Sequence, residues 1–265
     1  SGLARVQATP LSLFGLASRA MDAEEIYRSK LCSASQAVSL IESGNHVAMG
    51  MAMAEPPALL AALAERVEKG GMSGLRLWYF HSLEHAAATV LRRELLDRIR
   101  PRCMFLSSVE RRLIKECGSS PSPIDFVPVA FSESPRLLSE EVALDACVTT
   151  VSPMDRHGFF TFGTSNDYTS TAARAARRLI VEVNPEMPRV FGESHLHVSE
   201  VDAIVEHRAP LIELQEQAPE PEDETIAGII AGMIDDGACL QMGIGDLPSA
   251  VCARLANRKD LGIHT

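Results

Sequence analysis

The chain has 265 residues, of which 46% are hydrophobic and 23% are charged, so it can form one large domain or two modest ones with a substantial core. Its formal net charge of −10 argues against a surface for nucleic acid or an anionic membrane, because a negative surface repels phosphate groups. The sequence lacks an apolar run of the roughly 18 residues that a membrane-spanning helix needs, and we expect no membrane contact.

The segment at 1–20 contains two arginines, several serines and no acidic residue. This composition is typical of a transit peptide. An upstream start or a remnant of expression fits equally well, because the sequence from Met21, MDAEEIYRSKL, reads like a natural beginning. We therefore leave residues 1–20 out of the prediction of the fold.

From residue 33 onward, segments typical of helices alternate with short apolar segments typical of strands. A serine N-cap opens the first helix and Gly44 ends it, while the second helix has proline at its start and glycines at its end. The predicted helices cover 33–44, 56–71, 84–99, 109–117 and 171–178. The predicted strands cover 46–51, 75–80, 103–107, 124–131, 142–152 and 179–184.

The predicted strands are almost continuously hydrophobic rather than strictly alternating. That pattern favours parallel strands covered on both faces. Strands that alternate with helices build an α/β architecture with right-handed crossovers. The sequence therefore predicts an α/β fold with an open, mostly parallel sheet, interrupted by a turn-rich insert at 152–168 and by irregular chain with short strands at 186–207.

A run rich in proline and glutamate, QAPEPEDE at 217–224, is the best candidate for a linker between domains. It separates a first domain at 21–216 from a segment at 225–265 with a helix, a strand, a turn with a second helix, and the start of another strand. These are the opening units of a second, similar domain. Because they leave a sheet edge and apolar helix faces uncovered, we expect the segment to be mobile or covered by another polypeptide.

A glycine-rich turn lies early in this second segment, within LQMGIGDLPSAV at 240–251. Gly243 and Gly245 stand between a predicted strand and a predicted helix, where backbone N–H groups can bind an anion or a developing oxyanion. The turn lacks the third glycine of a dinucleotide fingerprint and the lysine of a P-loop. A tight turn without a binding role is the alternative.

Longer blocks give this turn its context: FSESPRLL at 131–138, VSPMDRHGFFTFGTSNDY at 151–168, IVEVNPEMPRVFGESHLHVSEVDAIVE at 180–206, the turn segment itself, and DLGIHT at 260–265. In this order they resemble the blocks of the acetyl-CoA hydrolase/transferase family, which includes 4-hydroxybutyrate, butyrate and succinate:acetate CoA-transferases. The resemblance extends from about residue 24 to the end of the chain. It implies a pair of α/β CoA-transferase domains with the active site between them.

The resemblance also implies where the chemistry lies. The family's nucleophilic glutamate, which becomes a glutamyl-CoA thioester, is expected directly after Thr265. We therefore assign no catalytic residue within the chain. We also expect these 265 residues alone to show no CoA-transferase turnover. A carboxylate attacks a thioester only if the oxyanion is stabilised, and a backbone N–H in the turn can do that. The chain departs from the family pattern at Asp246, where many relatives carry glycine or another small residue. The family's segment that contacts coenzyme A or the acyl carbonyl corresponds to Gly243, Ile244, Gly245, Asp246 and Leu247.

The leading hypothesis is therefore an acyl-CoA:carboxylate CoA-transferase. By resemblance, its partners are an acyl-CoA, a small carboxylate, the remaining C-terminal part of the enzyme and a second copy in a homo-oligomer. Coenzyme A is then a substrate, and no tightly bound cofactor is expected. Two alternatives stay open: an acyl-CoA hydrolase of the same fold, and a non-catalytic module that binds coenzyme A.

Cysteines and histidines favour structural roles. The six cysteines form no Cys-x-x-Cys pair, which indicates reduced thiols in a reducing compartment and hence a cytoplasmic protein. His195 and His197 alternate along one strand, and His81 and His85 have helical spacing, but neither pair is accompanied by a thiol or carboxylate motif. We therefore expect no metal site.

Ser152, Asp155 and His157 invite a nucleophilic triad, but the serine lacks the G-x-S-x-G elbow and the three residues are too close in sequence to converge. A turn into a hairpin that borders the substrate cleft is the better interpretation. Glu133 and Arg136 could border the acyl pocket, and a solvated helix start explains them as well.

Overall fold

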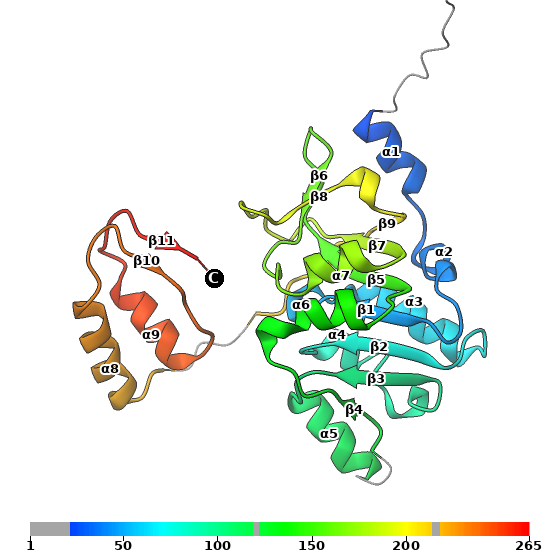
Figure 1. Cartoon of the computed structure of the whole chain (residues 1–265), viewed down its shortest axis with the longest axis horizontal. Helices are drawn as coiled ribbons and strands as arrows, with labels where there is room; N and C mark the ends of the chain where they lie inside the picture. The colour runs from blue at the N-terminus through cyan, green and yellow to red at the C-terminus, as the bar shows by residue number, and fades with distance from the viewer. Residues whose placement is uncertain (1–21, 119–121, 214–217, 265) are drawn as a thin grey trace, which may run out of the picture. The chain divides into compact units, whose positions relative to one another are not determined.

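A computed structural model of the chain describes residues 22–118, 122–213 and 218–264. The chain divides into two compact units, Ser1–Leu211 and Ile212–Thr265 (Figure 1). Buried side chains form a separate hydrophobic core in each unit. The leader expected at 1–20 lies outside the described residues.

The first unit is built on a sheet of seven strands in the order β4-β3-β2-β1-β5-β7-β9. Every neighbouring pair runs parallel, which confirms the predicted α/β fold with an open parallel sheet. The chain steps outward from β1 to β4, returns to the other side of β1, and steps outward again to β9. The strands are β1 His46–Met49, β2 Leu75–Tyr79, β3 Ile99–Cys103, β4 Asp125–Phe126, β5 Ala146–Val151, β7 Arg178–Val183 and β9 Ala203–Glu206.

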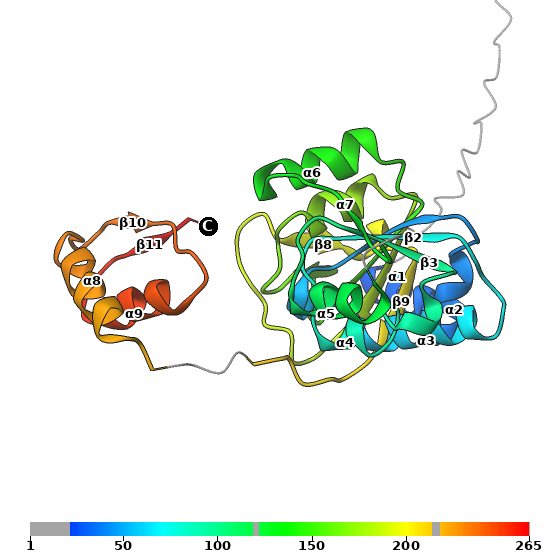
Figure 2. The same cartoon turned by 90° about the horizontal axis from the view of Figure 1, so that it is seen from below.

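Helices cover both faces of this sheet (Figure 2). Alternate residues of β1 enter two different cores, since Val47 and Met49 pack on one side and Ala48 on the other. Leu63 of α3 belongs to the first core and Ala172 of α7 to the second. The helices are α1 Ala23–Lys30, α2 Ala34–Ala37, α3 Pro57–Glu68, α4 Glu84–Ala87, α5 Ser108–Cys117, α6 Ser134–Arg136 and α7 Thr169–Ala175. Within the described ranges, each helix falls short of the length and apolar character that a bilayer crossing requires.

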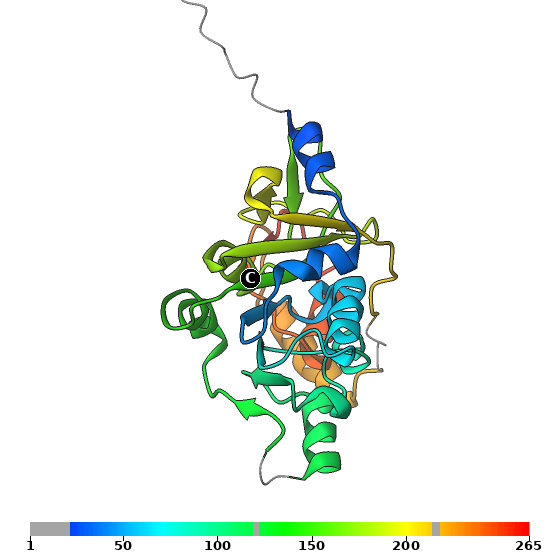
Figure 3. The same cartoon turned by 90° about the vertical axis from the view of Figure 1, so that its right-hand side faces the viewer.

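The predicted turn-rich insert contains one strand of a small two-stranded antiparallel sheet. β6 Phe159–Thr161 pairs antiparallel with β8 His195–His197. This small sheet lies beside α1 (Figure 3), and a Cβ on Gly158, just before β6, would approach the side chain of Ala23 to 2.7 Å. The pairing of β6 with β8 joins the insert to the irregular chain that precedes β9.

The prediction of a helix over 84–99 and a strand over 103–107 was wrong. The chain forms only the short α4 and a 3-10 turn at Arg93–Leu95, and β3 begins at Ile99. In β3 the alternate residues are buried, whereas Arg100 and Arg102 form ion pairs with Asp125. The two arginines interrupt the apolar pattern of β3. A continuous apolar run follows directly after it, and the predicted strand was therefore placed at 103–107.

The strand predicted over 124–131 is shorter than expected. β4 contains only Asp125 and Phe126, after which Val127 donates its N–H to the carbonyl of Cys103 over 2.8 Å. Pro128 follows and has no N–H to continue the ladder. The apolar run therefore leaves the sheet at its edge.

The second unit contains α8 Pro221–Gly232, β10 Cys239–Leu240, α9 Asp246–Arg254 and β11 Gly262–Ile263. β10 and β11 run parallel, and Ala227, Ala231 and Leu255 lie in the core between α8 and α9. Helix α8 begins within the expected linker, because proline suits the first turn of a helix; residue 217 of that linker lies outside the described residues. The first strand predicted for this segment is short and has only two paired residues, Cys239 and Leu240.

Candidate functional site

The strand order of the first unit reverses between β1 and β5, and parallel sheets bind ligands beyond the carboxyl ends of the strands at such a place. The chain turns tightly as it leaves β1. Gly50 donates its N–H to the carbonyl of Val148 over 2.9 Å, and a Cβ on Gly50 would lie 2.5 Å from the carbonyl oxygen of Ala54. Ala52 has a φ of +50°, a strained conformation for a residue with a side chain. The packed structure therefore holds this loop in a fixed place.

Three phenylalanines that follow β2, β3 and β4 form an aromatic platform, in which Phe80 is half-buried and Phe105 and Phe131 are exposed. The rings of Phe80 and Phe105 stack with centroids 5.7 Å apart, and the ring of Phe131 lies 4.7 Å from that of Phe80. His81 contacts the edge of Phe105 at 5.7 Å. Phe105 is 45% exposed and Phe131 is 48% exposed. Large apolar side chains that stay exposed at the carboxyl edge of a parallel sheet make this surface a candidate for binding an apolar group.

Two carboxyl groups of the first unit, the buried Glu55 and the half-buried Asp167, have pKa values that are raised toward neutral pH. Glu55 accepts the backbone N–H groups of Leu83 over 2.7 Å and Ala86 over 3.0 Å, yet its burial outweighs these bonds and raises its pKa to about 7. Burial likewise raises the pKa of Asp167 to about 6, although Thr169 donates both its N–H and its hydroxyl to this carboxyl. The cost of burying these carboxyls calls for a structural or functional reason.

The turn predicted from the sequence lies in the second unit, at the N-terminus of α9. Gly243, Ile244, Gly245 and Asp246 are exposed, and Leu247 is half-buried. Gly245 is the N-cap of α9 with a φ of +138°, a region that residues with a Cβ rarely adopt. The first turn of a helix leaves backbone N–H groups without partners inside the helix. These N–H groups can therefore serve an anion or an oxyanion at the turn.

The two glycines of the turn differ in whether the surrounding structure requires a residue without a side chain. A Cβ on Gly243 would make an ordinary contact at 3.6 Å with the Pro248 ring, whereas Gly245 has the special φ. The backbone therefore favours glycine at Gly245, and the described residues impose no such restriction at Gly243.

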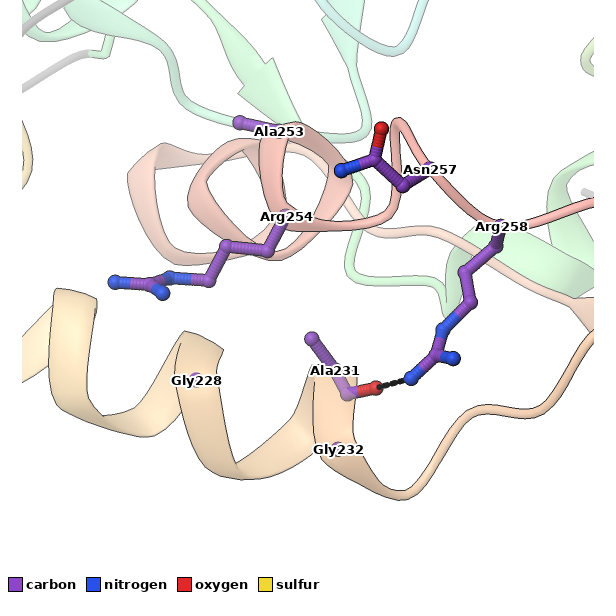
Figure 4. A pocket seen from close by; sticks show the side chains of 7 residues that line it. All are labelled: Gly228, Ala231, Gly232, Ala253, Arg254, Asn257 and Arg258. Atoms are coloured by element: carbon purple, nitrogen blue, oxygen red, sulfur yellow. Dashed lines mark hydrogen bonds between the residues drawn. The ribbon is translucent and has the colours of Figure 1, made fainter.

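A cavity of about 430 Å³ lies between α8 and α9 (Figure 4). Gly228 and Gly232 lie on its α8 side, opposite Arg254 and Arg258. Arg254 forms an ion pair with Glu224, and Arg258 donates to the carbonyl of Ala231 over 3.1 Å. Both arginines thus hold the two helices together, and helix packing explains the cavity.

The residues of the rejected triad do not converge. The buried hydroxyl of Ser152 accepts the N–H of Thr161 over 2.9 Å, Asp155 pairs with Arg189, and the His157 ring accepts a hydrogen bond from Arg156. They shape the turn that leads into β6. Glu133 and Arg136 form an ion pair with each other at 2.9 Å, three residues apart on the surface.

Among the described residues, no three His, Cys, Asp or Glu side chains are grouped so that they could hold a metal ion. The His195 ring donates its Nδ1–H to the carbonyl of Gly192, and the His197 ring bonds to the Ser199 hydroxyl. The six cysteines are free thiols. Burial raises the pKa of the Cys147 thiol to about 12, so this cysteine is an inert part of the core.

Comparison with known proteins places these features in a family. The chain is 37% identical over 242 residues to succinyl-CoA:cyclohexane-1-carboxylate CoA transferase of Geobacter metallireducens, covering 91% of this chain and 53% of that protein. It is 37% identical over 246 residues to 4-hydroxybutyrate coenzyme A transferase of Clostridium kluyveri, covering 92% of this chain and 55% of that protein. The chain thus spans about half the length of the curated relatives it matches.

Solved structures agree with this likeness. The crystal structure of RipA from Yersinia pestis matches with a TM-score of 0.86 and 51% identity, covering 92% of this chain and 57% of RipA. 4-hydroxybutyrate CoA-transferase from Porphyromonas gingivalis matches with a TM-score of 0.72 and 31% identity, covering 91% of this chain and 55% of that one. The model of the acetyl-CoA hydrolase/transferase N-terminal domain matches residues 16–214. The chain therefore belongs to the acetyl-CoA hydrolase/transferase family.

Proposed function

We propose that the natural protein containing this chain is an acyl-CoA:carboxylate CoA-transferase. The observation that carries the proposal is the similarity along 91–92% of the chain to relatives that are named CoA transferases. The second unit adds a physical reason, since an exposed glycine turn stands at a helix N-terminus where it can stabilise an oxyanion.

The proposed reaction proceeds through a glutamate expected directly after Thr265. Its carboxylate attacks the acyl-CoA carbonyl, and the thiolate of coenzyme A leaves as a mixed anhydride forms. The thiolate then attacks the glutamyl carbonyl, which releases the first carboxylate and leaves a glutamyl-CoA thioester. An acceptor carboxylate reverses these steps to give the new acyl-CoA.

In this proposal the turn Gly243, Ile244, Gly245, Asp246 and Leu247 contacts coenzyme A or the reacting carbonyl. Negative charge develops on the carbonyl oxygen during each attack, so a fixed backbone N–H lowers the barrier. Glycine at Gly243 leaves room for the thioester to approach the backbone. The aromatic platform of the first unit would receive the hydrocarbon part of the acyl group.

We further propose that the protein is a homo-oligomer of the reducing cytoplasm that binds coenzyme A only as a substrate. The free thiols support the compartment. The oligomer, and a C-terminal part that completes the second unit, rest on the resemblance to the family.

Product analysis separates the transferase from its alternatives. The full-length protein, given an acyl-CoA and a different carboxylate, should convert the acceptor into its CoA thioester, and chromatography of the CoA species detects that product. Free coenzyme A that forms equally fast without an acceptor would indicate a hydrolase. An acyl-CoA that binds but is not consumed would indicate a binding module.

A further inference from the structure

Four consecutive residues, Phe80 to Leu83, are each held by a different part of the first unit. They follow β2 at the carboxyl edge of the sheet, and two of them, Phe80 and His81, are half-buried and contact the exposed ring of Phe105. The four contacts are Phe80 N–H to the Tyr168 hydroxyl at 3.2 Å, Ala52 N–H to the His81 carbonyl at 3.2 Å, the Ser82 hydroxyl to the Glu110 carboxylate, and Leu83 N–H to the Glu55 carboxylate at 2.7 Å.

Two of these contacts come from fully buried carboxyl groups on opposite sides of the segment. Glu55 is 1% exposed and precedes α3, while Glu110 is 0% exposed and belongs to α5. Glu55 also accepts the N–H of Ala86 over 3.0 Å and so fixes the first turn of α4. The Thr150 hydroxyl donates to the backbone carbonyl of Glu55 over 3.0 Å, which ties this residue to β5. Glu55 therefore links the reversal point of the sheet to the segment that carries Phe80 and His81.

Burial of a carboxyl group raises the free energy of the folded state, and a hydrophobic residue of similar size would stabilise the fold more. A short helix such as α4 could be capped by a serine or an aspartate of its own chain. Here the cap comes instead from a residue that lies 28 positions earlier in the sequence. This arrangement fixes one loop relative to another, which is what a precise binding surface needs.

We propose that Glu55 is a positioning residue: its carboxylate holds the segment Phe80–Leu83 so that Phe80 and His81 set the shape of the acyl-binding surface and hence the preference among acyl groups. This inference rests on the proposed transferase function. Glu55 itself does not touch the substrate in this account, since the carboxylate is buried and bonded to backbone.

The variant Glu55→Gln tests the proposal, because glutamine keeps the volume but supplies only one acceptor oxygen for the two N–H groups. Glu182→Gln is the matched control. Glu182 is also a buried carboxyl that accepts a backbone N–H near the start of a helix, from Leu59 over 3.0 Å, and it bonds to His207 instead of to the Phe80–Leu83 segment. Both variants are measured in the full-length protein.

The kinetic readout is the ratio of kcat/KM for butyryl-CoA to kcat/KM for acetyl-CoA. In Glu55→Gln this ratio should change by about tenfold, the scale at which a pocket distinguishes short acyl groups. In Glu182→Gln it should stay as in the wild type even if the melting temperature falls. An unchanged ratio in folded Glu55→Gln, or an equal change in both variants, would overturn the proposal.

Two further measurements keep the test decisive. If Glu55→Gln fails to fold, Ser82→Ala removes the tie of the same segment to Glu110 and should change the ratio in its place. Hydrogen exchange of the Leu83 and Ala86 amides should be faster in Glu55→Gln than in Glu182→Gln, and this readout does not depend on turnover. If the wild type transfers no coenzyme A, both the proposed function and the role of Glu55 are wrong. If the wild type is active and folded Glu55→Gln has the same ratio, only the role of Glu55 is wrong.

Discussion

The backbone N–H of His264 donates to the carbonyl oxygen of Leu240 over 2.8 Å. This bond continues the parallel pairing of β10 and β11 beyond Ile263. The carboxyl ends of parallel strands lie at the same edge of a sheet, so the chain leaves β11 beside the start of the glycine turn. A glutamate placed soon after His264 would therefore begin close to the backbone N–H groups that we propose as oxyanion donors.

Gly243→Ala tests the proposed contact between the turn and the ligand. The added Cβ would make only an ordinary contact with Pro248, so we expect little change in the melting temperature of the full-length protein. If the thioester approaches the backbone here, kcat should fall by about 10²-fold, the scale of losing one oxyanion donor. Thermal melting and steady-state kinetics give both values. Normal kcat in Gly243→Ala would contradict the contact.

Gly245→Val provides the comparison for Gly243→Ala. The backbone φ of +138° at Gly245 strains a valine whether or not a ligand binds. This strain should lower the free energy of unfolding by about 1–3 kcal/mol. Activity and stability should therefore fall together in Gly245→Val, whereas only activity should fall in Gly243→Ala. Gly243→Ala is therefore the cleaner test of function.

Phe131→Ala tests the aromatic platform. Phe131 is 48% exposed, so its removal should cost little stability. We expect kcat/KM for butyryl-CoA to fall by about tenfold while the value for acetyl-CoA changes less, because the longer chain loses more apolar contact. Phe126→Ala is the control, since Phe126 is 50% exposed on the edge strand β4 outside the platform. Equal losses in both variants would contradict a specific acyl surface.

The stability of the first unit should depend on pH through Glu55. Its pKa is raised from 4.5 to about 7 on folding, mainly by burial, so the folded state binds this proton more tightly than the unfolded state does. The stabilisation of the folded state by protonated Glu55 is complete below about pH 4.5 and is lost as the pH rises to about 7. Over that range, wild type should lose about 3 kcal/mol of unfolding free energy relative to Glu55→Gln.

Urea unfolding at a series of pH values measures this difference. The single tryptophan of the chain, Trp78, lies on β2 and is 8% exposed, so its fluorescence reports the first unit. Other titrating groups, such as Asp167, remain in both proteins and cancel in the comparison. Parallel curves for the two proteins would show that Glu55 does not titrate in this range.

Much of the fold could be predicted from the sequence, because the parallel strands and their helices have simple apolar patterns. α3 follows its proline start, and β5 and β7 lie within continuous apolar runs. β3 was missed because Arg100 and Arg102 find a partner, Asp125, that is distant in sequence. Local patterns cannot reveal such a pairing.

The candidate site shows the same limit. The glycine turn could be found because its residues are contiguous and flanked by a strand and a helix. The aromatic platform could not, since Phe80, Phe105 and Phe131 meet only after three parallel strands align. The role of Glu55 was equally hidden, because the residue precedes a proline pair and bonds to backbone groups 28 residues away.

The most direct measurement of the central claim is mass spectrometry of the full-length protein after brief incubation with an acyl-CoA and no acceptor carboxylate. We expect a coenzyme A thioester to form on the glutamate proposed to follow Thr265, and to disappear when a carboxylate is added. Steady transfer of coenzyme A between carboxylates without any such adduct would contradict the account.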